Sequence, residues 1–192
     1  MSPPTPAQIR QLERVLSREP ILDVSNLGFL RNNPVTDCWF AGDAAMFRGI
    51  SDHEWIYIGA ADTAGLGALL ALLAPDERYF AAIEDWMEPV ILAGRSARWR
   101  LWTRRFVLPR TVALPPSHPG SAPLRPDAAE HVHRLSEYRD LAPASYIRDR
   151  IERGPSVGIR RGDELVAWGL THDDGALGMI HVLPEARCGG LG

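Results

Sequence analysis

The chain has 192 residues, of which 45% are hydrophobic and 23% are charged, and its formal net charge is −3. These values are typical of a globular protein of one large or two small domains, and the charge gives no reason to expect a nucleic-acid partner. All 21 basic residues are arginine, which excludes Schiff-base chemistry and a Walker-type phosphate lysine. The sequence shows no signal-peptide pattern, no membrane-length apolar run and no metal-ligand spacing around its two cysteines. We therefore expect a cytoplasmic protein with neither a membrane partner nor a metal.

Residues 1–108 alternate between helical and strand patterns and are predicted to form the N-terminal domain. Apolar residues three or four positions apart indicate helices, whereas alternation or short apolar runs indicate strands. The predicted helices are 6–18, 21–30, 63–73 and 78–92, and the predicted strands are 38–41, 44–48, 55–58 and 98–108. The dipeptide Gly42-Asp43 lies between two of these strands and predicts a β-hairpin.

Residues 109–126 are rich in proline and predict a linker between two domains. The second domain, 127–192, begins with two helical patterns and continues with three strand patterns. The predicted helices are 127–141 and 143–153, and the predicted strands are 157–160, 164–171 and 177–183. Gly154-Pro155 ends the second helix, and short turns of Asp and Gly join the strands.

The last strand pattern leads into a glycine-rich loop. Pro184 ends the strand because it has no N–H group, and the segment Arg187-Cys-Gly-Gly-Leu-Gly192 follows. Such a loop exposes several backbone N–H groups on one side and can bind phosphate. The arrangement of strand, proline and Arg-x-x-Gly-x-Gly resembles the acyl-CoA loop of the GNAT superfamily of N-acyltransferases. Residues 145–156 and 164–168 resemble its glycine N-acyltransferase-like branch. A glycine-rich turn without a ligand is the alternative interpretation.

A fainter copy of this motif lies in the first domain. Residues 55–67 align with residues 180–192 at a constant offset of 125 positions, and Asp62 stands in the place of Arg187. A carboxylate there would repel a diphosphate, so the first copy is predicted to be structural. Together with the resemblance, the repeat implies an α+β protein of two tandem GNAT-like units. Each unit would be a mixed sheet flanked by helices, and the second would lack its C-terminal half. A chance similarity between two Gly-Leu-Gly segments is the alternative.

The resemblance also implies roles for the end of the chain. The co-substrate would be acetyl-CoA or another acyl-CoA, with no metal. The implied cofactor-binding residues are Val182, Leu183, Arg187, Cys188, Gly189, Gly190, Leu191 and Gly192. A backbone N–H near Val182 or Leu183 would stabilise the oxyanion that forms from the thioester. His181 is the one titratable side chain within the strand and is the candidate catalytic base, with a hydrogen-bonded sheet histidine as the alternative.

The predicted function is the transfer of an acyl group from acyl-CoA to the primary amine of a small molecule. A non-catalytic CoA-binding module or a truncated remnant is the alternative. Ala176 stands where related glycine N-acyltransferases carry a carboxylate, so the resemblance does not extend to glycine as the acceptor. The helix that carries the superfamily's general-acid tyrosine would follow Gly192. We therefore expect this 192-residue chain to be inactive by itself. The acceptor, the acyl chain length and the oligomeric state stay open.

Overall fold

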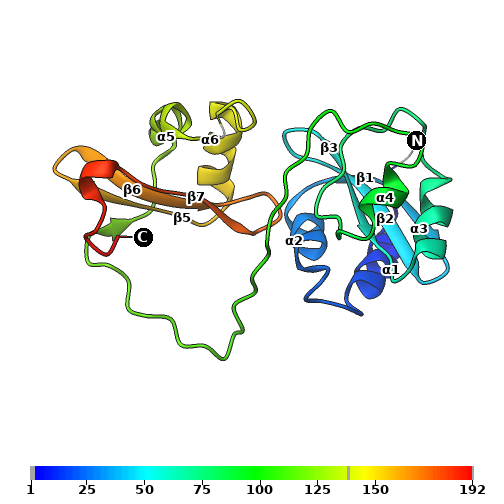
Figure 1. The fold of residues 1–192 in the computed structure, drawn as a ribbon. Helices are drawn as coiled ribbons and strands as arrows, with labels where there is room; N and C mark the ends of the chain where they lie inside the picture. Colours follow the sequence, from blue (N-terminus) through cyan, green and yellow to red (C-terminus); the bar gives the residue numbers. More distant parts are fainter. Residues whose placement is uncertain (1–2, 138, 192) are drawn as a thin grey trace. The chain divides into compact units, whose positions relative to one another are not determined.

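A computed structural model describes residues 3–137 and 139–191 of the chain. The chain divides into two compact units, Met1–Arg110 (unit 1) and Thr111–Gly192 (unit 2). The described residues form six α-helices and two antiparallel sheets, of three and four strands, so the protein belongs to the α+β class (Figure 1). The longest described helix has 11 residues, and no described helix is both long enough and apolar enough to cross a membrane.

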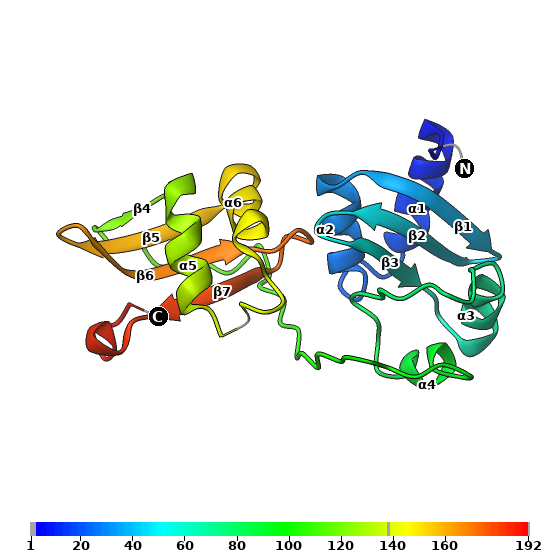
Figure 2. The same cartoon turned by 90° about the horizontal axis from the view of Figure 1, so that it is seen from above.

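Unit 1 contains two helices, then three strands, then two further helices (Figure 2). The helices are α1 (Pro6–Leu16), α2 (Val24–Asn32), α3 (Thr63–Leu70) and α4 (Glu88–Ile91), and the strands are β1 (Val35–Ala41), β2 (Ala44–Ile50) and β3 (Glu54–Gly59). Thr5 begins α1 through a capping box with Gln8. Gly42, with φ 58°, supplies the left-handed residue of the β1–β2 turn. The strands pair in the order β1-β2-β3, and the predicted hairpin and the strand after it are confirmed.

Each face of the unit 1 sheet carries its own hydrophobic core. On one face Phe47 stacks on Tyr57, with ring centroids 5.2 Å apart, and packs against α1 and α2. On the other face Met46 and Ile56 pack against α3 and α4. Successive side chains of a strand point to opposite faces, so β2 supplies both cores. All four side chains are at most 3% exposed, and the sheet is therefore covered on both sides.

The predicted helix over 78–92 is wrong, because only α4 near its end is helical. Pro89 lies in the first turn of α4, whereas a proline inside a longer helix would clash with the carbonyl four residues earlier. The residues before α4 instead run beside β3. The Ile56 N–H donates to the Tyr79 carbonyl at 2.8 Å, and the Ala81 N–H donates to the Ile56 carbonyl at 3.0 Å.

The expected mixed sheets are also wrong. All named strands pair antiparallel, and the one parallel pairing of the described chain is the isolated bridge between Ile56 and Phe80. Ala82, with φ 54°, takes the left-handed conformation just after this bridge. That conformation ends the extended backbone, so the bridge does not grow into a strand.

The predicted strand over 98–108 is wrong as well. These residues have no strand partner within the described chain, and their apolar side chains are exposed, by 60% at Trp102 and 84% at Phe106. The segment is held by polar contacts instead, since an Arg105 N–H donates to the Leu22 carbonyl at 3.0 Å. The alternation of aromatic and basic residues fits a strand, but a strand forms only where a neighbour completes the hydrogen-bond ladder.

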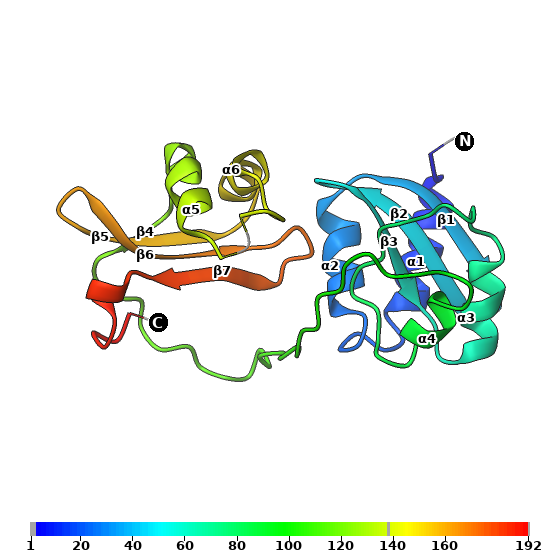
Figure 3. The same cartoon turned by 45° about the horizontal axis from the view of Figure 1, so that its top comes forward.

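Unit 2 places two helices on one face of a four-stranded sheet (Figures 1 and 3). The helices are α5 (Ala129–Leu135) and α6 (Ala144–Arg153), the 3-10 turns are η1 (Pro126–Ala128) and η2 (Pro184–Ala186), and the strands are β4 (Ser121–Ala122), β5 (Ser156–Arg161), β6 (Glu164–Thr171) and β7 (Leu177–Val182). The strand order is β4-β5-β6-β7, and the three predicted strands are confirmed. The first predicted helix, over 127–141, ends early, at Leu135, because Ser136 takes an extended backbone conformation. The short strand β4 lies inside the predicted linker.

The described part of unit 2 has a single core, between the helices and the sheet. Val132 of α5 and Ile147 of α6 pack there with Trp168 of β6, and all three are at most 4% exposed. The opposite face of the sheet exposes Val157 and Ile180, by 42% and 59%. Unlike the sheet of unit 1, this sheet is covered on one side only within the described residues.

Candidate functional site

The last strand of unit 2 lies at an open edge of the sheet, because β7 pairs only with β6 among the described strands. The Leu183 N–H donates to the Val166 carbonyl at 2.9 Å. In an antiparallel pair, successive residues point their backbone groups alternately toward and away from the neighbouring strand. Val182 therefore points its N–H and C=O groups away from β6. Of the two residues predicted to supply an oxyanion donor, Val182 has the outward N–H, whereas the Leu183 N–H is used within the sheet.

A β-bulge shapes β7 just before this point. The register with β6 shifts between Trp168 and Leu170, because Met179 and Ile180 together take the place of one residue. Met179 has the left-handed φ of 50°. A bulge bends the strand and increases its twist, so it changes the direction of the backbone just before His181.

The loop after η2 makes sharp turns. Cys188 and Gly190 have positive φ angles of 61° and 72°. Such left-handed residues allow a short loop to turn and to present its amide groups to solvent. Residues 187–190 are all exposed, and Leu191 is half-buried against the core of unit 2. Gly192, the last predicted binding residue, lies outside the described residues.

Arg187 is tied back to the end of β7. Its Nε donates to the Val182 carbonyl at 3.0 Å. This bond uses one of the five guanidinium N–H groups and orients the other four, which lie on the two terminal nitrogens. A guanidinium held in this way suits two-point contact with phosphate oxygens.

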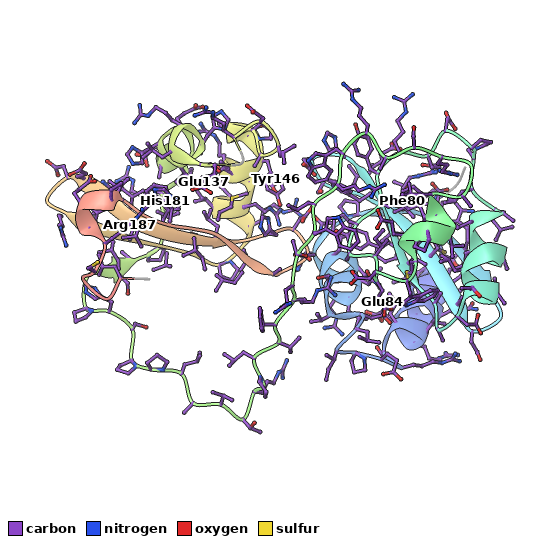
Figure 4. The ribbon with its side chains drawn as sticks, viewed as in Figure 1. Phe80, Glu84, Glu137, Tyr146, His181 and Arg187 are labelled. Atoms are coloured by element: carbon purple, nitrogen blue, oxygen red, sulfur yellow. The ribbon has the colours of Figure 1, made fainter. Side chains whose placement is uncertain are left out.

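A pocket of about 430 Å³ lies between α5 and the β7 edge. Its lining residues are Val132, Ser136, Glu137, Trp168, Met179, Ile180, His181, Val182 and Arg187. The volume falls within the usual range of small-molecule sites. Arg187 and His181 are the basic groups of the lining and Glu137 is its carboxylate, and Figure 4 shows these three side chains in unit 2. The pocket thus brings the predicted site residues His181, Val182 and Arg187 together with Glu137, a carboxylate that the sequence patterns did not single out.

His181 is half-buried and stacks on Trp168, with ring centroids 4.6 Å apart and an angle of 20° between the rings. Trp168 also contacts His131 of α5 edge-on, at 5.6 Å. The stack fixes the plane of the His181 imidazole against a buried side chain. The same geometry serves a catalytic base held in place and a histidine that packs in the sheet, so both interpretations stay open.

Sequence reasoning missed Glu137, Trp168 and Met179 as pocket residues. The predicted helix over 127–141 placed Glu137 inside a helix, because the loop after Leu135 carried no strong turn signal. The strand pattern over 164–171 includes Trp168, but the contact of this side chain with the pocket depends on the register of β6 against β7. The bulge at Met179 lies in an apolar run that gives no sign of it.

A second polar cluster joins α6 to the β6–β7 turn. The Tyr146 hydroxyl lies 3.3 Å from His172 Nδ1 and 3.4 Å from Asp173 Oδ1, and the Arg150 guanidinium lies 5.8 Å from the centre of the Tyr146 ring. None of these four residues lines the described pocket. Their contacts hold the turn against the helix.

The corresponding loop of unit 1 is built differently. Asp62 is the N-cap residue of α3, and its Oδ1 accepts a hydrogen bond from the Gly65 N–H at 2.8 Å. Gly65 aligns with Gly190 in the sequence repeat. The chain's own carboxylate thus occupies an amide that a phosphate would need, which gives Asp62 a structural role at the start of a helix.

Comparisons with known proteins bear on the fold alone. No protein-family model matches the chain, and no curated protein matches it significantly. Among solved structures, the chain is similar to the X-ray structure of a Drosophila protein from a structural genomics consortium. The TM-score is 0.68 at 16% sequence identity, and the match covers 98% of this chain and 80% of that one. Within the described residues, no group of three or more His, Cys, Asp or Glu side chains could hold a metal ion.

Proposed function

We propose that the protein is a GNAT-like N-acyltransferase, which transfers the acyl group of an acyl-CoA to a primary amine of a small molecule. Acetyl-CoA is the first candidate donor. The observation that carries the proposal is the end of β7, where the outward N–H of Val182 lies between an arginine-glycine loop and a pocket that contains His181. An acyl transfer needs an amide donor for the oxyanion, a site for the phosphates and a base for the amine.

The donor would bind along the open edge of β7. Its diphosphate would meet Arg187 and the amide groups of residues 188–190, where left-handed residues turn the loop. Its pantetheine arm carries amides, which can hydrogen-bond to the free edge as an added strand does. The thioester would then lie near Val182, with its carbonyl oxygen toward the outward N–H.

The chemistry would follow in one direct transfer. The ammonium of the acceptor gives a proton to His181, and its nitrogen attacks the thioester carbon. The oxyanion then forms beside the Val182 N–H. Collapse breaks the C–S bond, and the thiolate takes the proton from His181, while the second proton leaves the nitrogen for solvent. The products are an amide, free CoA and one proton.

The second candidate function is a CoA-binding module without catalysis. The stack of His181 on Trp168 favours it, because a histidine that packs in the sheet need not move protons. In this candidate the loop and the edge of β7 keep their binding role, and the pocket holds the acyl group without an acceptor.

Calorimetry with acetyl-CoA and a thiol-release assay with a mixture of primary amines separate the candidates. In a chain that continues past Gly192, we expect binding together with amine-dependent release, and a His181→Gln variant that binds acetyl-CoA normally but loses transfer. The 192 residues alone are expected to be inactive, so the activity assays use the longer chain. Binding without release would favour the module, and absence of binding would remove CoA from both.

A further inference from the structure

The pocket beside β7 contains one carboxylate in its described lining, and its chemistry points to a class of acceptor. We propose that Glu137 binds the ammonium group of the acceptor, and that the acceptor is an alkylamine or arylalkylamine without a carboxylate of its own. This inference rests on the proposed acyltransferase function and names the substrate class of the same pocket.

Glu137 reaches the pocket because α5 ends early. Ser136 has an extended backbone, with φ −71° and ψ 136°, and its N–H donates to the His133 carbonyl at 3.2 Å. The chain leaves the helix at this point, and Glu137 lines the pocket together with residues 179–182 of β7. Figure 4 shows Glu137 on the side of the sheet that carries α5 and α6.

The charges of the pocket are divided among three side chains. Arg187 belongs to the glycine-rich loop after η2, and its Nε donates to the Val182 carbonyl. His181 is held in the strand by its stack on Trp168. A diphosphate is therefore drawn to Arg187, and Glu137 is left to attract a cation. An ammonium group satisfies Glu137 and also stands in the same pocket as the histidine that would accept its proton.

An acceptor with its own carboxylate fits these charges poorly. Its carboxylate would be repelled by Glu137, and the described lining includes no arginine besides Arg187. The rest of the lining is largely apolar, with Val132, Trp168 and Met179 among its residues. A hydrocarbon body suits this surface, because burying apolar area in a pocket is favourable.

The matched substrates for a test are phenethylamine and phenylalanine, which differ only by the carboxylate. With acetyl-CoA as donor, we expect phenethylamine to have the higher kcat/KM by about tenfold or more, because like charges in a site disfavour binding. Glu137→Gln should lower kcat/KM for phenethylamine by about tenfold, mainly through KM, and leave phenylalanine unchanged or improved. Glu130→Gln is the control, since Glu130 is an exposed α5 carboxylate outside the pocket.

Calorimetry with phenethylamine and no acetyl-CoA keeps the acceptor site separate from the transferase activity. Binding that is weakened by Glu137→Gln but not by Glu130→Gln supports the amine site even if no thiol is released. If acetyl-CoA turnover continues, two results would overturn the proposal. One is an equal loss of kcat/KM for both substrates in Glu137→Gln, and the other is a higher kcat/KM for phenylalanine than for phenethylamine. Failure of acetyl-CoA to bind at all would count against the transferase function instead.

Discussion

Both units contain two helices followed by three antiparallel strands, which the short strand β4 precedes in unit 2, and in both a hairpin turns at a Gly-Asp pair. Gly42 has φ 58° in unit 1, and Gly162 has φ 60° in unit 2. The units then diverge at the loop after the third of these strands. In unit 1 the loop enters α3 under the carboxylate of Asp62, whereas in unit 2 it passes through η2 to the guanidinium of Arg187.

The outer edge of that strand differs in the same way. In unit 1 the edge of β3 is filled, because residues 79–81 bond to Ile56 and the Asn26 amide donates to the Ile58 carbonyl at 3.0 Å. In unit 2 the edge of β7 is open and adjoins a pocket. The same order of elements thus gives a closed unit where the chain fills its own edge, and a unit with room for a ligand where it does not.

The largest loss of stability is expected from a substitution in the core of unit 1. Phe47→Ala removes a side chain that is fully buried between Phe29 and Tyr57, and should destabilise unit 1 by about 3–5 kcal/mol. Val157→Ala on the exposed face of unit 2 should cost less than about 1 kcal/mol. Urea unfolding, read with hydrogen exchange on β2, measures both, and a small loss for Phe47→Ala would mean that this core is not packed as described.

Charge reversal at Arg187 tests whether the loop of unit 2 binds acyl-CoA. Arg187→Glu should weaken acetyl-CoA binding by about 10- to 100-fold, because attraction of the diphosphate becomes repulsion. Arg125→Glu makes the same charge change at an exposed residue outside the pocket and should have little effect. Isothermal calorimetry gives both affinities, and equal weakening in the two variants would show only a general charge effect.

Asp62→Ala should have the opposite profile, with a loss of stability and no loss of binding. Removal of the N-cap should cost about 1 kcal/mol of stability, and acetyl-CoA affinity should stay the same. Asp62→Asn keeps a capping oxygen and should cost less. Thermal unfolding and calorimetry on the two variants check this, and a change in affinity for Asp62→Ala would assign a ligand to unit 1.

A half-buried carboxyl, that of Asp23, should make the stability of unit 1 depend on pH. Burial raises the pKa of Asp23 from 3.8 to about 6, with Glu84 and Glu19 acting in the same direction and Asn26 and Arg105 opposing it. The native state then binds more protons than the unfolded state between these values. The free energy of unfolding should therefore fall as pH rises from about 4 to 6.

Asp23→Asn should remove this dependence. Since the carboxyl is only half-buried and is screened by solvent, we expect the variant to be more stable than the parent by about 1 kcal/mol above pH 7. The two proteins should converge near pH 4. Urea titrations at pH 4, 5, 6 and 7 provide the test, and parallel curves for parent and variant would contradict the raised pKa.

Local signals in the sequence are enough to predict the three consecutive strands of each unit, β1–β3 and β5–β7, and the turns between them. Gly42-Asp43 and Gly162-Asp163 mark their hairpins, and apolar runs mark the strands beside them. The helix predicted over 78–92 is wrong because its apolar residues have helical spacing but Pro89 cannot lie inside a long helix. The strand over 98–108 failed because pairing depends on a neighbour that the segment itself cannot indicate.

In the candidate site, too, the local features could be predicted from the sequence, whereas the features that depend on pairing across the sheet could not. The motif located Arg187 and the residues after it, since glycines and their spacing are local features. The choice of Val182 over Leu183 depends on which backbone groups face β6, and therefore on pairing across the sheet. The presence of Glu137 in the pocket depends on where α5 ends, and the predicted helix extends beyond Leu135 to residue 141.

The exposed Cys188 gives the loop of unit 2 a labelling position of its own. The other cysteine, Cys38, is half-buried in β1, and burial beside Asp37 raises the pKa of its thiol. Because the thiolate is the form that reacts, a maleimide dye should reach Cys188 first. A fluorophore at that position would stand next to Arg187, so the loop could report its own occupancy in the unmutated protein, through quenching or through slower labelling when acetyl-CoA is present.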